Sequence, residues 1–389
     1  MPAAPETWPH YADDEIAAAI EVLASGRVNQ WTGDKVKAFE AAFAAYVGQP
    51  HAVAVFNGTV ALELALRSLG IGPGDEVIVT PRSFIASAST VTTVGATPVF
   101  AEVDAGSGNI TPSTIRTMLG PRTRAILPVH IGGWPAEMPE IMALAREHGL
   151  KVIEDCAQSQ GARIDGRPAG SFGDAAAFSF CQDKIITTGG EGGIVLFRDR
   201  DAWSRAWSYK DHGKSYERMV APPDRPGFRF VHESIGTNWR MIEMQAAIGL
   251  CQLGKLDQWV EARRRRAEIW RDALASVACL RIPLPRQGIR HAFYKLHAFL
   301  LPAALKDGVT RDDILVALVG EGIRAFSGGC SEIYRERAFA GQNEPERPVA
   351  RALGETNLMF EVHPTLDEAR LATTAARAAR IIQSFARSA

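Results

Sequence analysis

Short apolar runs that alternate with helix-length segments constrain the fold of this 389-residue chain more than any other feature. Seven such runs are typical of buried strands, and they occupy 51–56, 76–80, 97–103, 124–129, 151–155, 175–180 and 192–197. Most are separated by segments with the apolar spacing of helices, among them 60–69, 83–94 and 138–148. Because parallel strands are joined by helical crossovers, this alternation predicts an α/β fold in which helices cover both faces of a mostly parallel seven-stranded sheet.

The pattern changes in the last third of the chain, where helices outnumber strands. After the alternating region we predict helices at 243–275, 311–321 and 366–386 and a strand at 292–300. Before that region we predict two helices, at 12–25 and 34–46. We therefore predict two domains, a large α/β domain at 1–255 and a smaller C-terminal α+β domain at 256–389.

Composition argues against several classes of function. The formal net charge of −1 and the pI near 6.8 give no basic field for nucleic acid or an anionic membrane, and four consecutive arginines at 263–266 are expected to form a solvated helix face. The five cysteines form no C-x-x-C pair and no zinc spacing, so we expect reduced thiols and no metal site. The N-terminus lacks a charged segment followed by an apolar core, and no run of about 18 apolar residues occurs, which predicts a cytoplasmic protein without a membrane partner.

One lysine is a candidate nucleophile. Lys184 lies in a glycine-rich loop at 181–193 between two predicted strands, and α/β proteins place catalytic residues in such loops. A deprotonated amine there can form a Schiff base with a carbonyl compound. On this segment alone, a solvated surface lysine remains the alternative.

Three further segments place polar groups where a charged aromatic cofactor could bind. Asp155 ends a predicted strand, and a fixed carboxylate at that position can keep a pyridine nitrogen protonated. Gly58 and Thr59 begin a predicted helix, where free N–H groups and a hydroxyl suit a phosphate. Asn238 and Arg240 offer an amide and a guanidinium before another helix. Taken singly, each segment could also be an ordinary helix cap or a surface charge.

In this order along the chain, these segments resemble the fold-type I pyridoxal-phosphate (PLP) enzymes, and specifically the sugar aminotransferases of the DegT/DnrJ/EryC1/StrS family. The resemblance covers nearly the whole chain. It also includes the segments 70–79, 95–100, 128–133 and 244–250, which read GIGPGDEVIV, GATPVF, PVHIGG and MQAAIGL. The resemblance implies the fold-type I architecture and PLP as the cofactor.

The resemblance also implies a role for each matching residue. Lys184 would carry the cofactor as a Schiff base, and Asp155 would contact its pyridine nitrogen. Gln158 would approach the phenolic oxygen of the ring, and Phe84 would stack on the ring, with a core phenylalanine as the alternative for Phe84. The phosphate would be bound by Gly58, Thr59, Ser179 and Asn238. Asn238 matches a residue that reaches the phosphate from the neighbouring subunit, which implies a homodimer with shared active sites.

Two positions decide how far the resemblance extends. Asn57 stands where many relatives have serine, so an amide replaces a possible phosphate hydroxyl. Some relatives have histidine at the position of Lys184 and catalyse dehydration, so the lysine favours transamination. We therefore expect the chain to move an amino group from an amino acid, with glutamate as the expected donor, to a nucleotide-linked keto sugar such as a 4-keto-6-deoxyhexose. Such a product would serve surface polysaccharide or amino-sugar synthesis.

Polar and aromatic loops are expected to contact the nucleotide sugar. The predicted contacts are Trp31, His212, Lys214 and Arg240, and the segment 201–233 is predicted to be a long irregular stretch with a functional role. Three alternatives remain open: a cyclitol aminotransferase, a PLP-dependent sugar dehydratase and, more remotely, a non-catalytic regulator on the same scaffold.

Overall fold

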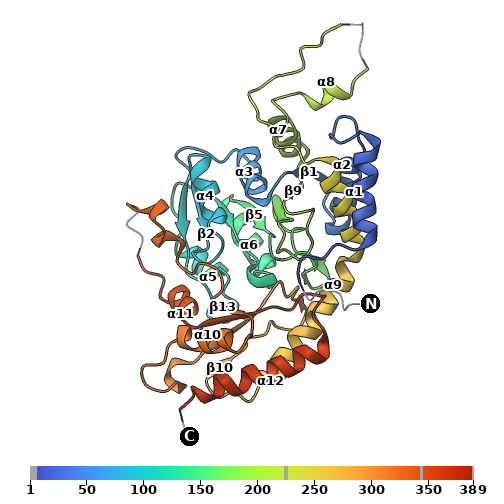
Figure 1. Cartoon of the computed structure of the whole chain (residues 1–389). Coiled ribbons are helices and arrows are strands. Elements are labelled where there is room, and N and C mark those ends of the chain that lie inside the picture. Colours follow the sequence, from blue (N-terminus) through green and yellow to red (C-terminus); the bar gives the residue numbers. More distant parts are fainter. Residues whose placement is uncertain (1–6, 223–226, 342–344, 388–389) are drawn as a thin grey trace.

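The computed structural model describes residues 7–222, 227–341 and 345–387 (Figure 1). Residues 1–6, which bear on the expected absence of a targeting segment, and residues 223–226, part of the predicted irregular stretch, lie outside these ranges. No helix within the described ranges is both long and apolar enough to cross a lipid bilayer.

A seven-stranded sheet forms the centre of the large domain, in the order β1-β9-β8-β5-β4-β2-β3. Neighbouring strands run parallel except around β9, which is antiparallel to both β1 and β8. The predicted mostly parallel sheet is thus confirmed. Its strands are β1 (His51–Val55), β2 (Glu76–Val79), β3 (Thr97–Phe100), β4 (Thr123–Leu127), β5 (Lys151–Asp155), β8 (Ala175–Ser179) and β9 (Gly193–Phe197).

Helices cover both faces of this sheet because each strand sends alternate side chains to opposite sides. Val53 and Val55 of β1 belong to the core formed with α3, α4 and α7, whereas Ala52 and Ala54 belong to the core formed with α2 and α9. At the other end of the second face, α5 and α6 pack on β2, β4 and β5. The helices of this region are α1 (Asp13–Ser25), α2 (Lys35–Val47), α3 (Gly58–Ser68), α4 (Ala86–Thr93), α5 (Pro112–Arg116), α6 (Met138–His148), α7 (Arg200–Lys210), α8 (Tyr216–Val220) and α9 (Glu243–Leu274).

The C-terminal part is built on an antiparallel four-stranded sheet in the order β10-β12-β14-β13, with α10 and α12 packed against it (Figure 1). A small sheet, β11-β6-β7, joins this part to the loop after β5. The predicted boundary at 255 lies inside the continuous helix α9, so the division of the chain there remains a proposal. The remaining elements are β6 (Arg163–Ile164), β7 (Arg167–Pro168), β10 (Leu280–Arg281), β11 (Ile289–Arg290), β12 (Leu296–Leu300), β13 (Ala325–Phe326), β14 (Asn357–Phe360), α10 (Arg311–Gly320), α11 (Pro348–Thr356) and α12 (Glu368–Ser384), with short 3-10 turns at Ile131–Gly133, Pro302–Ala304, Ile333–Arg335 and Arg337–Phe339.

The segment predicted to be irregular, 201–233, contains two helices, α7 and α8, so that prediction is wrong for its first part. Asp199 caps α7 by accepting the N–H of Ala202 at 2.8 Å. Trp203 and Trp207, one helical turn apart, both pack edge-on against Tyr216. Aromatic packing therefore orders a segment whose charge and proline content suggested a loop. The described residues 227–233 lie away from the body of the molecule, near α8 (Figure 1).

The arginine run at 263–266 is not a solvated face, contrary to expectation. Arg263 is 1% exposed and donates to the backbone oxygen of Tyr294 at 3.1 Å, and Arg266 donates to the backbone oxygen of Leu366. Only Arg264 and Arg265 are substantially exposed. The cause is the packing around α9, which contacts α1, α2 and α12. Trp8 and Tyr294 cover Arg263, and Leu366 and Glu368 at the start of α12 cover Arg266.

Candidate active site

A cleft of about 540 Å³ opens at the edge of the sheet where the parallel strands end. Side chains from loops after β2, β5 and β8 line one side, including Phe84, Gln158 and Lys184, and the C-terminal part contributes Tyr294 and the turn at Gly328. Parallel strands all end at this edge, and α/β enzymes bind their ligands there. The fold thus brings Phe84, Gln158 and Lys184 together, as the sequence predicted.

Lys184 presents its amine to the cleft. Its side chain is 15% exposed, with Nζ 3.6 Å from Oδ1 of Asp183 and 5.0 Å from the ring centroid of Tyr294. The Tyr294 hydroxyl donates a hydrogen bond to the other carboxylate oxygen of Asp183. Burial alone would raise the pKa of Asp183, but Lys184 and the Tyr294 hydroxyl outweigh it and hold the pKa below its usual value. Asp183 therefore stays ionised and pairs with the lysine.

The backbone of Lys184 is braced from the N-terminal end of the chain. The indole Nε1 of Trp8 donates to the carbonyl oxygen of Lys184 at 2.7 Å. The Trp8 ring packs edge-on against Trp259, and the guanidinium of Arg263 lies 5.0 Å from its centroid. This bracing, like the Asp183–Tyr294 pair, was missed by sequence reasoning, because no local pattern links residues so far apart in the chain.

Asp155 lies buried at the end of β5, below the floor of the cleft. Its Oδ2 accepts from the Ser87 hydroxyl at 2.8 Å, and its Oδ1 accepts from the N–H of Ala157 at 3.1 Å. Burial raises its pKa, and the hydrogen bonds and the charge of Lys184 offset this only in part. A carboxylate in such surroundings is stabilised in its charged form by a cation placed against it, and a protonated ring nitrogen is such a cation.

The start of α3 lies against the end of β8. A Cβ added to Gly58 would lie 2.6 Å from Cβ of Ser179, so only glycine lets the helix start approach this closely. Asn57 caps α3 by accepting the N–H of Val60 at 3.0 Å, which is the capping role that the sequence left open. The amides of Gly58 and the exposed Thr59 precede the first helical hydrogen bonds, so their N–H groups suit a phosphate. The structure thus places Gly58 against Ser179, with Thr59 next to Gly58 at the helix start.

Gln158 and Phe84 present different groups to the cleft, an amide and an aromatic ring. The side-chain oxygen of Gln158 accepts from the N–H of Gly132 at 2.7 Å, which leaves its amide nitrogen as a donor for the cleft. Phe84 is 66% exposed although it lines the cleft, so it is not the core phenylalanine of the alternative interpretation. Both arrangements fit a flat aromatic ligand bearing an oxygen acceptor.

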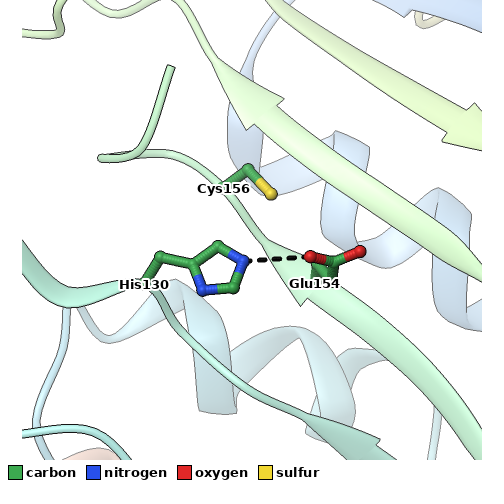
Figure 2. Close-up of side chains that lie close together, drawn as sticks. All are labelled: His130, Glu154 and Cys156. Atoms are coloured by element: carbon green, nitrogen blue, oxygen red, sulfur yellow. Dashed lines mark hydrogen bonds and ion pairs between the residues drawn. The ribbon is translucent and has the colours of Figure 1, made fainter. Parts of the chain in front are cut away.

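A buried cluster of His130, Glu154 and Cys156 lies beside β5 (Figure 2). His130 Nδ1 accepts from the N–H of Ala136, so its other ring nitrogen carries the proton and donates to Glu154 at 3.1 Å. The Glu154 oxygens also accept three backbone N–H groups, those of Gly170, Phe172 and Gly173, at 2.7–2.8 Å. These hydrogen bonds occupy the lone pairs that a metal ion would need. The cluster instead anchors the loop before β8.

Three of the four predicted sugar contacts gather around Asp211, away from the lysine cleft. Oδ1 of this fully buried carboxylate meets Nζ of Lys214 at 3.0 Å and Nη1 of Arg240 at 2.7 Å. Lys214 also lies 4.4 Å from the ring centroid of Trp31. His212 is exposed, and its backbone N–H donates to the oxygen of Thr237. Asn238 pairs with Asp211 through its backbone. Like Asp155, Gly58, Thr59 and Ser179, Asn238 is not among the described residues that line the lysine cleft.

Comparison with known proteins places the chain in a family. The model of the DegT/DnrJ/EryC1/StrS aminotransferase family matches residues 9–377. A UDP-N-acetyl-3-dehydro-alpha-D-glucosamine 3-aminotransferase from Acidithiobacillus ferrooxidans is 39% identical over 343 residues, covering 88% of this chain and 87% of the relative. A GDP-perosamine synthase from Caulobacter vibrioides is 38% identical over 335 residues, covering 85% of each chain.

The fold agrees with these relatives. An aminotransferase structure from Psychrobacter cryohalolentis superposes with a TM-score of 0.93 at 47% identity, covering 97% of this chain and 98% of that chain. The resemblance seen in the sequence and the predicted fold class are both confirmed. The chain therefore belongs to the DegT/DnrJ/EryC1/StrS aminotransferase family and is an aminotransferase.

Proposed function

We propose that the cleft binds PLP and transfers an amino group from an amino acid, with glutamate as the donor, to a nucleotide-linked keto sugar. The observation that carries this proposal is the convergence of an amine, a buried carboxylate and an anion site at one sheet edge. When bound, PLP supplies an electron-withdrawing ring that stabilises negative charge on a substrate carbon.

The residues present fit this cofactor group by group. Gly58, Thr59 and Ser179 would hold the phosphate, and Asp155 would hold the proton on the ring nitrogen. The free amide nitrogen of Gln158 would donate to the phenolic oxygen, and the exposed ring of Phe84 would cover one face of the cofactor. Asp155 is a buried carboxylate whose pKa is raised by burial in spite of its hydrogen bonds, and a cationic ring beside it best explains this feature.

Lys184 would act twice. Its Nζ would hold the cofactor through its carbonyl group, and the same amine, once free, would take a proton from the donor's α-carbon and return it as general base and acid. Asp183 and Tyr294 hold Nζ at the mouth of the cleft, and Trp8 fixes the backbone from which the side chain extends. Such positioning keeps the amine within reach of both reacting atoms.

The two relatives support a nucleotide sugar as the acceptor, since one is named for a UDP-linked 3-dehydro sugar and the other for GDP-perosamine. We retain a nucleotide-linked 4-keto-6-deoxyhexose as the proposed acceptor, in amino-sugar or surface polysaccharide synthesis. Gly329 and Cys330 border both the cleft and an adjoining hollow of about 360 Å³, which gives a sugar nucleotide room to extend.

A substrate panel tests this function. Glutamate should convert the lysine-bound cofactor band at roughly 410–430 nm to one near ~330 nm, because the amino group stays on the cofactor. UDP-, dTDP- and GDP-linked keto sugars, both 3-keto and 4-keto, should restore the first band at least about tenfold more efficiently than free keto sugars, since diphosphate binding positions the carbonyl. Restoration only by a keto cyclitol or a keto acid would contradict the proposed acceptor and leave the aminotransferase intact.

We propose further that the active enzyme is a homodimer in which Asn238 serves the neighbouring chain's phosphate site. The support is the family resemblance, in which the residue matching Asn238 reaches the phosphate of the neighbouring subunit; in this chain Asn238 is held by its backbone to Asp211, beside Lys214 and Arg240.

Subunit mixing tests this arrangement. Lys184→Ala and Asn238→Ala chains, each nearly inactive, should regain activity when mixed, because every heterodimer contains one site with both residues intact. Random exchange predicts recovery of about a quarter of the wild-type sites. Absence of recovery after exchange, verified by mass spectrometry of tagged chains, would show that each chain completes its own pocket.

A further inference from the structure

Arg82 is a buried cation for which the described protein supplies no anion. It lies in the loop after β2, lines the cleft together with Lys184 and is 4% exposed. Its guanidinium carbon lies 5.6 Å from the ring centroid of Phe299, and its Nη1 would be 2.6 Å from a Cβ added to Gly108. Within residues 7–222, 227–341 and 345–387, neither a carboxylate nor any other hydrogen-bond acceptor meets this guanidinium.

The arginine keeps its charge in this position. Burial lowers the pKa of Arg82 only to about 10, so the side chain is cationic at neutral pH. The neighbouring His297 offers no compensation, because burial and, to a smaller extent, Arg82 lower its pKa to about 3 and leave it neutral. Buried charges in proteins are normally paired, since an unpaired one is costly. The position is therefore suited to an anionic group brought by a ligand.

The charge balance of the cleft indicates which anion fits. Lys184 is already matched by Asp183, and the lining otherwise adds one cation, Arg82, and the exposed acid Glu336. A single planar guanidinium matches one carboxylate in a two-pronged contact. A diphosphate calls for more positive charge, and the cations predicted for it, Lys214 and Arg240, are bound to Asp211 outside this lining.

We propose that Arg82 binds a carboxylate of the amino donor and so selects amino acids over simple amines. The proposal rests on the aminotransferase function proposed above, in which the donor must bring its amine to Lys184 inside the same cleft. It assigns to Arg82 a specificity role that depends on the planar fork as well as the charge.

A matched pair of reagents isolates the carboxylate. Aminooxyacetate and methoxyamine both react with a lysine-bound carbonyl cofactor, but only the first carries a carboxylate. In Arg82→Gln holoenzyme, the half-saturating concentration of aminooxyacetate should rise about 10- to 100-fold, the range expected for losing hydrogen bonds to a charged group, while methoxyamine reacts as in wild type. Arg82→Lys should recover part of the loss, because it restores charge without the fork.

Arg281→Gln is the control variant. Arg281 also lies over the Phe299 ring, at 4.7 Å, but it donates to the backbone of Ala105 and is absent from the described lining of the cleft. Arg281→Gln should react with aminooxyacetate and with methoxyamine as wild type does. An equal loss with methoxyamine in Arg82→Gln, or no loss with aminooxyacetate, would overturn the proposal and leave Arg82 a structural residue.

Natural donors then show which carboxylate is bound. If Arg82→Gln reacts more weakly than wild type with glutamate and alanine but equally well with 4-aminobutyrate, Arg82 binds the α-carboxylate. If it reacts more weakly with glutamate and 4-aminobutyrate but equally well with alanine, Arg82 binds the distal carboxylate. If wild-type enzyme reacts with both reagents but no amino acid or amine donor yields the ~330 nm band, the proposed function fails while the reagent pair still decides the role of Arg82.

Discussion

Replacement of Lys184 by alanine should abolish the lysine-bound cofactor band and lower turnover on the order of 10³-fold or more, since proton transfer by a positioned side chain alone contributes roughly 10²–10⁴-fold. The variant loses both the covalent link to the cofactor and the base that moves the proton. Absorbance spectra and single-turnover kinetics with glutamate measure the two losses separately. Lys184→Arg should be nearly as inactive, because it keeps the charge beside Asp183 but forms no Schiff base.

Lys151→Ala provides the control for this experiment. Lys151 starts β5, the strand that ends at Asp155, and its exposed amine pairs with Asp174 at 3.4 Å far from the cleft. Its replacement should leave the band and the turnover unchanged. Turnover of Lys184→Ala within about tenfold of wild type would refute the assignment of this lysine.

The architecture was predictable because the buried strands carry their signal locally. Runs such as 151–155 and 175–180 are continuous and apolar, as strands covered on both faces must be, and the segments between them are long enough for crossover helices. The same regularity places Asp155, Ser179 and Lys184 at one sheet edge. Once the strands are predicted to be parallel, the residues that follow them are therefore predicted to lie at the same edge of the sheet.

The packing around the site could not be read in the same way. Trp8 meets Lys184 across 176 positions of the chain, and Tyr294 meets Asp183 across 111. Each is an ordinary aromatic residue within its own segment. Arg263 is buried by Trp8 and Tyr294, and Arg82 is buried against Phe299, contacts that come from distant parts of the chain. Charge, which usually marks a surface position, misleads at such places.

Two aromatic residues, Phe84 and Trp31, were predicted to contact ligands. Phe84 was predicted from the resemblance to lie on a ligand, with a core position as the alternative, and its exposure at the cleft removes that alternative. Trp31 was predicted to contact a sugar, which stays a prediction; the structure places it beside Lys214, another predicted sugar contact, and Trp207. Whether this cluster reaches a substrate depends on the proposed partner chain.

Asp155→Asn should preserve cofactor binding and slow the chemistry by roughly a hundredfold or more. The amide is nearly isosteric: its oxygen can still accept from the Ala157 N–H, and its NH2 group can donate to the Ser87 hydroxyl oxygen, so the fold should be retained. It cannot hold a proton on the ring nitrogen, and each pKa unit lost by that nitrogen corresponds to about 1.4 kcal/mol of differential interaction, so a two-unit change already gives this factor. Single-turnover rates with glutamate measure the effect.

Ser87→Ala separates the charge of Asp155 from its placement. The variant keeps the carboxylate but removes the hydroxyl that donates to its Oδ2, so the ring nitrogen keeps its partner and the rate should fall much less than in Asp155→Asn. If Ser87→Ala were as slow as Asp155→Asn, the geometry of this floor rather than its charge would control the reaction. If Asp155→Asn reacted at the wild-type rate, Asp155 would be a structural acid that closes the end of β5, and the proposed cofactor site would lose the one charge that holds a proton on the ring.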